Sequence, residues 1–152
     1  MSDTRLAIAA WEALFRAQAT IAQELATGDV WGDLAPTEYG VLYALSAAPA
    51  GLRMSELSKD VLLSQAGLSR LVARLESRGL VVRSLDPDDG RASVLHLSSA
   101  GARLQRRIGA AHGRHVATAL TSCLDDEQLA SLRDLCRKLV VPSRAQPVES
   151  QK

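Results

Sequence analysis

Residues 64–97 constrain the fold of this chain more than any other segment. Their first part carries large apolar residues at positions 68, 71, 72 and 75, which is the spacing of one buried stripe on a helix. Ser64 stands where an N-cap is expected, and Gly79 stands where a helix commonly ends in a left-handed residue. The pattern therefore predicts an amphipathic helix over about residues 64–78.

Two short apolar segments follow this helix, at residues 80–85 and 92–97. The residues between them read Asp-Pro-Asp-Asp-Gly, which are strong turn formers, so the pair is predicted to form a β-hairpin. Gly90 is free to adopt a positive φ in this turn, and Arg91 follows it at the tip. Asp89 is placed to clamp the loop by pairing with an arginine. Because a two-stranded ribbon is barely stable alone, we expect it to pack against the helices as a wing.

A shorter helix is predicted just before the amphipathic one. Residues 54–61 place Leu57 and Val61 on one side, and only about three residues separate the two helices. Two helices joined by so short a turn form a helix-turn-helix, here over about residues 55–78.

The outer side of the second helix combines short or hydrogen-bonding residues with two long cations. A helix in a DNA major groove needs such a face, because small residues allow close approach, amides and guanidiniums read base edges, and cations meet phosphates. An ordinary solvated helix and a polar hairpin tip are the simpler interpretations, but the helix pair and the hairpin together favour DNA binding. The candidate DNA-contacting residues are Ser64, Gln65, Ala66, Ser69, Arg70 and Arg74 of the helix, with Asp89 and Arg91 of the wing.

The net charge of +1 looks unfavourable for a DNA-binding protein, but the charges are unevenly distributed. Residues 1–52 hold two basic and six acidic residues, whereas residues 53–107 hold ten basic and six acidic residues. The positive field is therefore concentrated in the segment predicted to bind DNA, where it acts within a Debye length of about 8–10 Å. We expect DNA binding to depend strongly on salt.

Residues 34–140 resemble the MarR (multiple-antibiotic-resistance regulator) family of bacterial winged-helix transcription factors. The resemblance rests on four segments in the order and spacing of that family, which read LAPTEY from residue 34, SQAGLSRLV from residue 64, LESRGLV from residue 75 and DPDDGR from residue 86. It implies that residues 64–78 are the recognition helix and that the aspartate and arginine of the wing are Asp89 and Arg91.

Two positions depart from the pattern of the family. Position 88 is often basic in relatives but is Asp88 here, which should weaken the contact of the wing with DNA. Ala35 stands where a serine or threonine commonly caps the helix that begins at Pro36, a small loss of stability at that helix end.

The resemblance also implies a function. Relatives are homodimeric, sequence-specific DNA-binding transcription regulators, usually repressors that are released by a small aromatic or phenolic ligand. A two-fold dimer presents two recognition helices to successive major grooves, so double-stranded DNA with a pseudo-palindromic operator is the expected partner. The alternative is a winged-helix module that binds another protein, but cations on both the helix and the wing favour DNA.

Long helices are predicted on both sides of this core, over about residues 3–27 and 98–140. Asp125 with Gln128 forms a capping box that divides the second region into two helices. The apolar stripes of these helices exceed what one small winged helix can cover, so we expect them to be dimerisation helices. The alternative is that they only close a monomeric core.

The expected fold class is therefore mainly α with a small β-wing, a winged helix-turn-helix core flanked by N- and C-terminal dimerisation helices. The wing occupies about residues 80–97. A single domain is expected over residues 1–141, followed by a flexible C-terminal tail over residues 142–152, which contains two prolines and many polar groups.

Ligand-contacting residues can be proposed only from the resemblance. Relatives bind their small-molecule effectors in a crevice between the dimerisation helices and the winged helix. By position, the candidates for its walls are Trp11, Phe15, Tyr39 and Tyr43. The alternative for each of these aromatic residues is a place in the core.

Motifs of catalytic sites are absent from the sequence, which has no G-x-S-x-G, no H-E-x-x-H and no P-loop. We therefore expect neither an enzyme nor a cofactor. His112 and His115 are i, i+3 neighbours, but no third ligand is evident nearby, so a packed or solvated pair is favoured over a metal site.

The chain is expected to be cytoplasmic and to make no membrane contact. No apolar run approaches the roughly 18 residues that span a bilayer, and Asp3 and Arg5 begin a helix instead of a secretory signal. Cys123 and Cys136 should be reduced in that compartment, and an antiparallel helix pair would hold them roughly 16 Å apart along its axis. A cysteine-based redox-responsive regulator is the minor alternative, because the first helix lacks the cysteine that peroxide-sensing relatives use.

Overall fold

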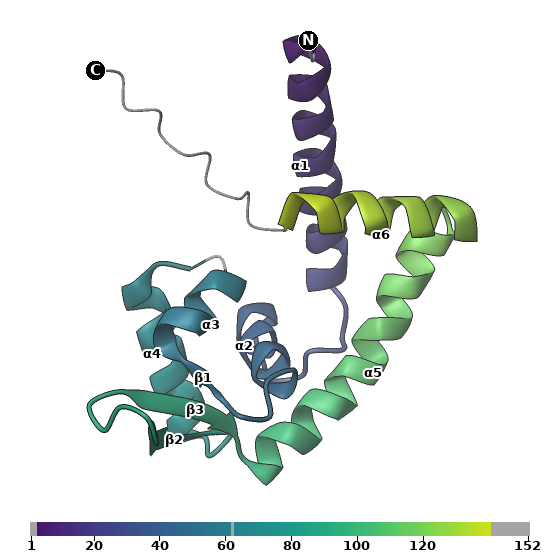
Figure 1. Cartoon of the computed structure of the whole chain (residues 1–152). Coiled ribbons are helices and arrows are strands. Elements are labelled where there is room, and N and C mark those ends of the chain that lie inside the picture. The colour runs from purple at the N-terminus through teal and green to yellow at the C-terminus, as the bar shows by residue number, and fades with distance from the viewer. Residues whose placement is uncertain (1–2, 62, 141–152) are drawn as a thin grey trace, which may run out of the picture. The chain divides into compact units, whose positions relative to one another are not determined.

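The computed structural model describes residues 3–61 and 63–140 and is mainly helical, with one small antiparallel sheet (Figure 1). Its elements in chain order are α1 (Thr4–Ala26), α2 (Pro36–Ser46), β1 (Leu52–Arg53), α3 (Met54–Asp60), α4 (Gln65–Ser77), β2 (Val81–Leu85), β3 (Ser93–Leu97), α5 (Ser99–Thr121) and α6 (Asp126–Val140). The predicted fold class, helices with a small β-wing, is confirmed.

The described residues divide into two compact units, one that ends at His115 and one that begins at Val116. The first unit holds α1 to α4, the sheet and most of α5, and the second holds the end of α5 and α6. That residues 1–141 form a single domain stays a prediction. The flexible tail predicted at residues 142–152 lies outside the described residues.

Leucine and valine side chains of α2, α3, α4 and the sheet build the core of the first unit. The stripe predicted on α4 is buried, with Leu68, Val72 and Leu75 fully covered and Leu71 only 4% exposed. Leu57 of α3 is fully buried as well. Burying one such side chain stabilises a fold by about 1.5–3 kcal/mol, so the stripe determines which side of α4 points outward.

Both ends of α4 have the predicted caps. The Ser64 hydroxyl oxygen accepts a hydrogen bond from the backbone N–H of Gly67 at 3.1 Å. At the other end Gly79 adopts a φ of 68°, and the N–H of Leu80 donates to the carbonyl oxygen of Leu75 at 2.9 Å. This is the left-handed helix ending that the glycine at position 79 predicts.

The hairpin is confirmed, and a third strand accompanies it. The strand order is β1-β3-β2, all antiparallel, with Val81 opposite Leu97 in the hairpin and Leu52 opposite Leu95 at the outer edge. β1 was not predicted because a strand of two residues shows no alternation in the sequence.

The start of α5 lies close to the end of α4. The Ser98 hydroxyl accepts from the N–H of Gly101 at 3.0 Å and donates to the carbonyl oxygen of Gly79 at 2.6 Å. A Cβ atom on Gly101 would lie 2.0 Å from the carbonyl oxygen of Leu80. A residue without a Cβ is therefore required where α5 leaves the sheet.

In the second unit, α6 begins at the predicted capping box. The N–H of Asp125 donates to Oε1 of Gln128 at 3.1 Å, and the N–H of Gln128 donates to Oδ1 of Asp125 at 2.9 Å. Two backbone donors that the helix itself cannot satisfy are thus paired.

α1 is long and largely uncovered. No residue of this helix is buried, and its apolar side chains include Ile8, Trp11 and Phe15, which are 53%, 65% and 58% exposed. Among the described residues no helix, α1 included, combines the length and the apolar character that crossing a membrane requires.

Candidate nucleic-acid interface

The outer face of α4 presents the predicted mixture of small and hydrogen-bonding residues. Gln65, Ala66, Ser69 and Arg70 are all exposed, on the side opposite the buried stripe. Ser64 is exposed at the N-cap. The Arg70 guanidinium makes no hydrogen bond or ion pair with any described residue, so all its donors are available to an incoming group.

Two further arginines of this helix region meet a buried carboxylate of α2. Arg74 is exposed as predicted, but its Nη2 lies 3.4 Å from Oε1 of Glu38. Arg78, the C-cap residue of α4, donates from Nη1 to Oε2 of Glu38 at 3.4 Å and from Nη2 to Oδ2 of Asp33 at 2.9 Å. The end of α4 is thereby tied to the start of α2 by charges.

Glu38 is only 6% exposed and sits in the first turn of α2. Its Oε2 accepts from the backbone N–H of Ala35 at 2.9 Å. Ala35 has no hydroxyl with which to cap the helix, so this bond is the only half of a capping box that the pair can form. The positive N-terminal end of the α2 dipole also stabilises the Glu38 carboxylate. This interaction offsets part of the helix stability that the missing side-chain cap at Ala35 is predicted to cost.

The loop of the wing differs from its prediction in two respects. Gly90 is not among the glycines with positive φ in the described chain. Backbone hydrogen bonds close the loop instead, from the N–H of Asp86 to Ala92 and from the N–H of Ala92 to Asp89, both at 2.9 Å. Asp89 does not pair with an arginine side chain, and its Oδ1 accepts from the backbone N–H of Arg91 at 3.1 Å.

Asp86 is the residue that clamps the loop. Its carboxylate is 7% exposed and accepts from Nε of Arg53 at 2.6 Å and from the backbone N–H of Asp88 at 2.8 Å. Arg53 directly precedes α3, so this ion pair joins the wing to the helix-turn-helix. The Asp88 N–H, followed by the Arg53 guanidinium, holds the pKa of the Asp86 carboxyl below its usual range.

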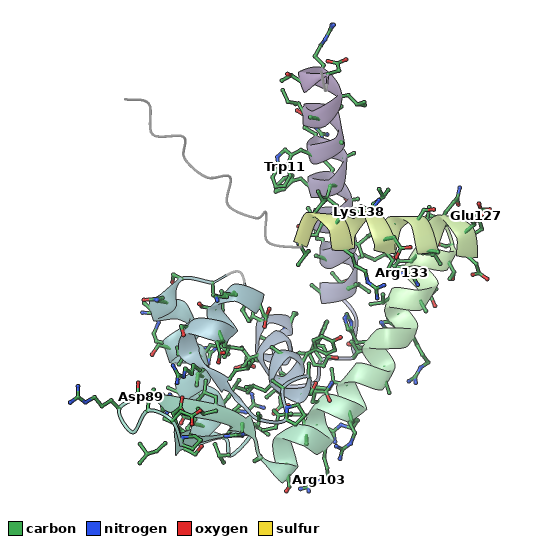
Figure 2. All side chains as sticks on the ribbon, in the orientation of Figure 1. Trp11, Asp89, Arg103, Glu127, Arg133 and Lys138 are labelled. Atoms are coloured by element: carbon green, nitrogen blue, oxygen red, sulfur yellow. The ribbon has the colours of Figure 1, made fainter. Side chains whose placement is uncertain are left out.

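The side chain of Arg91 is exposed just beyond this clamp and pairs with no described residue. The neighbouring Asp89 marks the end of the wing in Figure 2. A loop that is closed by hydrogen bonds and anchored at Asp86 carries the exposed Arg91 side chain. No sequence pattern pointed to Arg53, Glu38 or Asp86, because each acts on a partner more than 30 residues away.

Comparison with known proteins places this arrangement in a family. Residues 33–92 match the sequence profile of the MarR family. A MarR family transcriptional regulator from Streptomyces coelicolor, solved in complex with DNA, is 28% identical with a TM-score of 0.75, covering 96% of this chain and 94% of that one. The chain belongs to the MarR family.

Two further transcriptional regulators are similar to this chain. The PcaV transcriptional regulator from Streptomyces coelicolor, solved with its natural ligand, is 30% identical with a TM-score of 0.63, covering 84% of this chain and 86% of that one. The HTH-type transcriptional regulator YkoM of Bacillus subtilis is 30% identical over 94 residues, which span 61% of this chain and 60% of the length of YkoM. These proteins are transcriptional regulators and not enzymes.

The four aromatic residues predicted to line a ligand crevice lie in two pairs. The rings of Trp11 and Phe15 are 6.3 Å apart on α1, and the rings of Tyr39 and Tyr43 are 6.1 Å apart on α2. No ring contact between the two pairs is present among the described residues. Tyr39 instead packs on Trp31, with ring centroids 5.5 Å apart, a residue that the sequence analysis did not select.

A cavity of about 410 Å³ lies beside Trp31, between the segment that precedes α2 and the middle of α5. Neither aromatic pair contributes to its walls, which carry charges of both signs. Its lining includes Asp29, Trp31, Asp33, Arg107 and His115. Asp33 is also the partner of Arg78, so the wall of the cavity is in contact with the end of α4.

The histidine pair of α5 is packed at one residue and exposed at the other. The His112 ring lies 4.8 Å from Trp31 and 5.4 Å from Tyr39, and burial together with His115 holds its pKa below the usual range. Among the described residues no three histidine, cysteine or acidic side chains gather into a group that could hold a metal. Cys123 is exposed and Cys136 is half-buried, and both are free thiols.

Proposed function

We propose that the chain is a homodimeric, sequence-specific DNA-binding transcription regulator, and that it acts as a repressor released by a small ligand. The observation that carries the proposal is the uncovered outer face of α4, where Gln65, Ser69 and Arg70 are all exposed. Small residues next to long hydrogen-bonding ones suit the base edges of a major groove. The DNA-bound relative, which matches 96% of this chain, supports the same use of α4.

The candidate residues divide into base-reading, phosphate-binding and supporting groups. An arginine bonds a guanine edge through two nitrogens, and a glutamine bonds an adenine edge in the same way. Exposed cations at the flanks of the helix and on the wing bind phosphates, which set the register but not the sequence. We assign base reading to Gln65 and Arg70, close approach to Ser64, Ala66 and Ser69, phosphate binding to Arg74 and Arg91, and the shape of the wing loop to Asp89.

Dimerisation is supported by apolar side chains that each terminal helix leaves uncovered. Trp11 on α1 is 65% exposed, and Leu135 and Leu139 on α6 are 60% and 71% exposed. Soluble proteins rarely leave a run of large apolar residues on one helix in water, so we infer that a second copy covers each helix. A two-fold pair then presents two recognition helices about 34–36 Å apart, which requires a pseudo-palindromic operator.

Release by a small aromatic or phenolic ligand is supported by the cavity beside Trp31. Its volume of about 410 Å³ falls within the range of ligand pockets, roughly 300–1,000 Å³. Arg107 supplies a cation for an acidic ligand, and PcaV was solved with its natural ligand. Further ligand contacts are proposed for the two aromatic pairs, Trp11 with Phe15 and Tyr39 with Tyr43.

The test is to incubate the purified chain with sheared genomic DNA and to sequence the fragments that it retains. We expect enrichment of a pseudo-palindromic site whose half-sites are about one helical turn apart. A variant that carries both Arg70→Ala and Arg91→Ala serves as the control and should retain DNA without this enrichment. If the wild-type chain enriches no site, the proposal fails and a winged-helix protein-interaction module becomes the better description.

A further inference from the structure

Glu38 is a nearly buried carboxylate between α2 and the recognition helix, and the DNA contacts proposed above do not include it. We propose that Glu38 is a positioning residue for DNA binding, which fixes the direction of the Arg74 side chain so that its remaining donors meet a phosphate. This inference rests on the proposed use of α4 as a DNA-binding helix.

The first argument is the way in which Arg74 is held. Its guanidinium approaches Glu38 through Nη2, which lies 3.4 Å from Oε1, and 65% of the side chain stays exposed. A guanidinium has five N–H donors in a rigid planar fork. Some N–H donors of the Arg74 guanidinium can therefore contact Glu38 while the others face solvent. Two parallel N–H donors of one guanidinium are well suited to bind a phosphate.

The second argument is that Glu38 stays compensated when Arg74 also binds DNA. Its Oε2 accepts from the Ala35 N–H at 2.9 Å and from Nη1 of Arg78 at 3.4 Å. Arg78 is in turn held by Asp33 at 2.9 Å. A buried charge that loses its partner is costly. If Arg74 moves toward a phosphate, Glu38 keeps two hydrogen-bond donors, the Ala35 N–H and the cationic Arg78.

The third argument is the contrast between Arg74 and Arg70. The two arginines are four residues apart, so they lie on adjacent turns of the same outer face, where like charges repel. Glu38 relieves that repulsion at Arg74 and removes rotamers that point away from DNA. Immobilising one long side chain in advance saves about 0.5–1.5 kcal/mol on binding, which corresponds to about two- to tenfold in affinity for each subunit.

The test is a double-mutant cycle on the full chain, with the operator fragment selected from genomic DNA. Glu38→Gln keeps an oxygen for the Ala35 N–H but removes the charge. We expect it to weaken binding about two- to tenfold for each subunit, on the operator and on random DNA of equal length alike, because a phosphate contact carries no sequence information. In an Arg74→Ala background the same change should have no further effect, because its action passes through Arg74.

Asp60→Asn is the matched control, since Asp60 is exposed on α3 and its removal changes the net charge equally. It should weaken binding to neither the operator nor random DNA. An equal loss from Glu38→Gln with and without Arg74 would show a merely structural role and overturn the inference, and so would the absence of any loss from Glu38→Gln alone. A wild-type chain without sequence preference would overturn the proposed function as well.

Arg74→Lys provides a second variant that does not endanger the buried carboxylate. Lysine keeps the positive charge but has no planar fork with which to contact Glu38 and a phosphate together. We expect operator affinity to fall about twofold or more for each subunit, with an unchanged melting temperature. Affinity equal to that of the wild type would mean that a charge alone is sufficient, and would also overturn the inference.

Discussion

Arg83 of β2 donates two hydrogen bonds of 3.1 Å each to Glu76 of α4, from Nε to Oε1 and from Nη2 to Oε2. This side-on geometry fixes direction as well as distance, because both groups are planar. The wing is therefore attached to the recognition helix at its strand, in addition to its attachment to Arg53 at the loop. The two proposed DNA-contacting elements are held as one rigid surface.

Arg91→Ala should weaken operator binding and reduce the slope of log affinity against log salt by about one for each subunit, as expected when one phosphate contact is lost. The thermal stability should not change, because the side chain is exposed. Arg103→Ala is the matched control, since Arg103 lies at the start of α5, well away from the wing tip in Figure 2. An unchanged slope for Arg91→Ala would remove the wing from DNA binding.

Arg70→Ala should cost about 1–3 kcal/mol of operator binding if the guanidinium bonds a guanine edge. The preference of the protein for particular bases should weaken at one symmetric pair of operator positions and persist at the others. The measurement is selection from a randomised operator library with each protein. A uniform loss across all sequences would make Arg70 a phosphate contact.

Local patterns carried most of what the sequence predicted. The stripe on α4, its cap at Ser64 and its ending at Gly79 depend on neighbours within one or two turns, and all are confirmed. The loop clamp was assigned to the wrong aspartate, because three aspartates within four residues have the same local chemistry and only Asp86 faces Arg53. Glu38 was not predicted as a site residue for a related reason, since its two arginine partners lie 36 and 40 residues further along the chain.

Asp86→Asn should lower the free energy of unfolding at neutral pH, because the amide loses the charge that Arg53 and the Asp88 N–H stabilise. A carboxyl whose pKa is lowered on folding contributes stability above its unfolded pKa, about 3.9, and loses that contribution as pH falls through the folded value. The difference in the free energy of unfolding between the wild type and Asp86→Asn should thus be constant from pH 5 to pH 7 and shrink below about pH 4. Urea denaturation across this range measures it, and a difference that grows in acid would contradict the assignment.

Gly101→Ala should destabilise the fold by about 1–3 kcal/mol, the usual cost of overpacking, because its Cβ would lie 2.0 Å from a backbone oxygen that cannot move aside easily. Gly113→Ala in the same helix is the control, since nothing lies within 4 Å of its Cβ position. There alanine should stabilise the protein by about 0.4–1 kcal/mol through helix propensity. Equal stability of the two variants would contradict the close approach of α5 to Leu80.

The last prediction concerns Leu135 of α6. Leu135→Asp places a charge on the stripe that Leu132, Leu135 and Leu139 form, which we propose a second subunit covers. We expect a shift to monomers, a lower melting temperature and loss of specific DNA binding together, because a single half-site supplies too few contacts. The melting temperature of the wild type should also rise with protein concentration, since association stabilises the folded chain by mass action.

Arg137→Gln is the control for this variant, because it changes the net charge equally on the opposite side of α6 and should leave the dimer intact. Analytical ultracentrifugation across the micromolar range reports the state of association for all three proteins. If the wild type is a well-folded monomer that still binds one operator tightly, the apolar stripe of α6 serves some other purpose than dimerisation. A dimer that persists in Leu135→Asp would instead place the subunit interface elsewhere, with the exposed Trp11 and Phe15 of α1 as the next surface to alter.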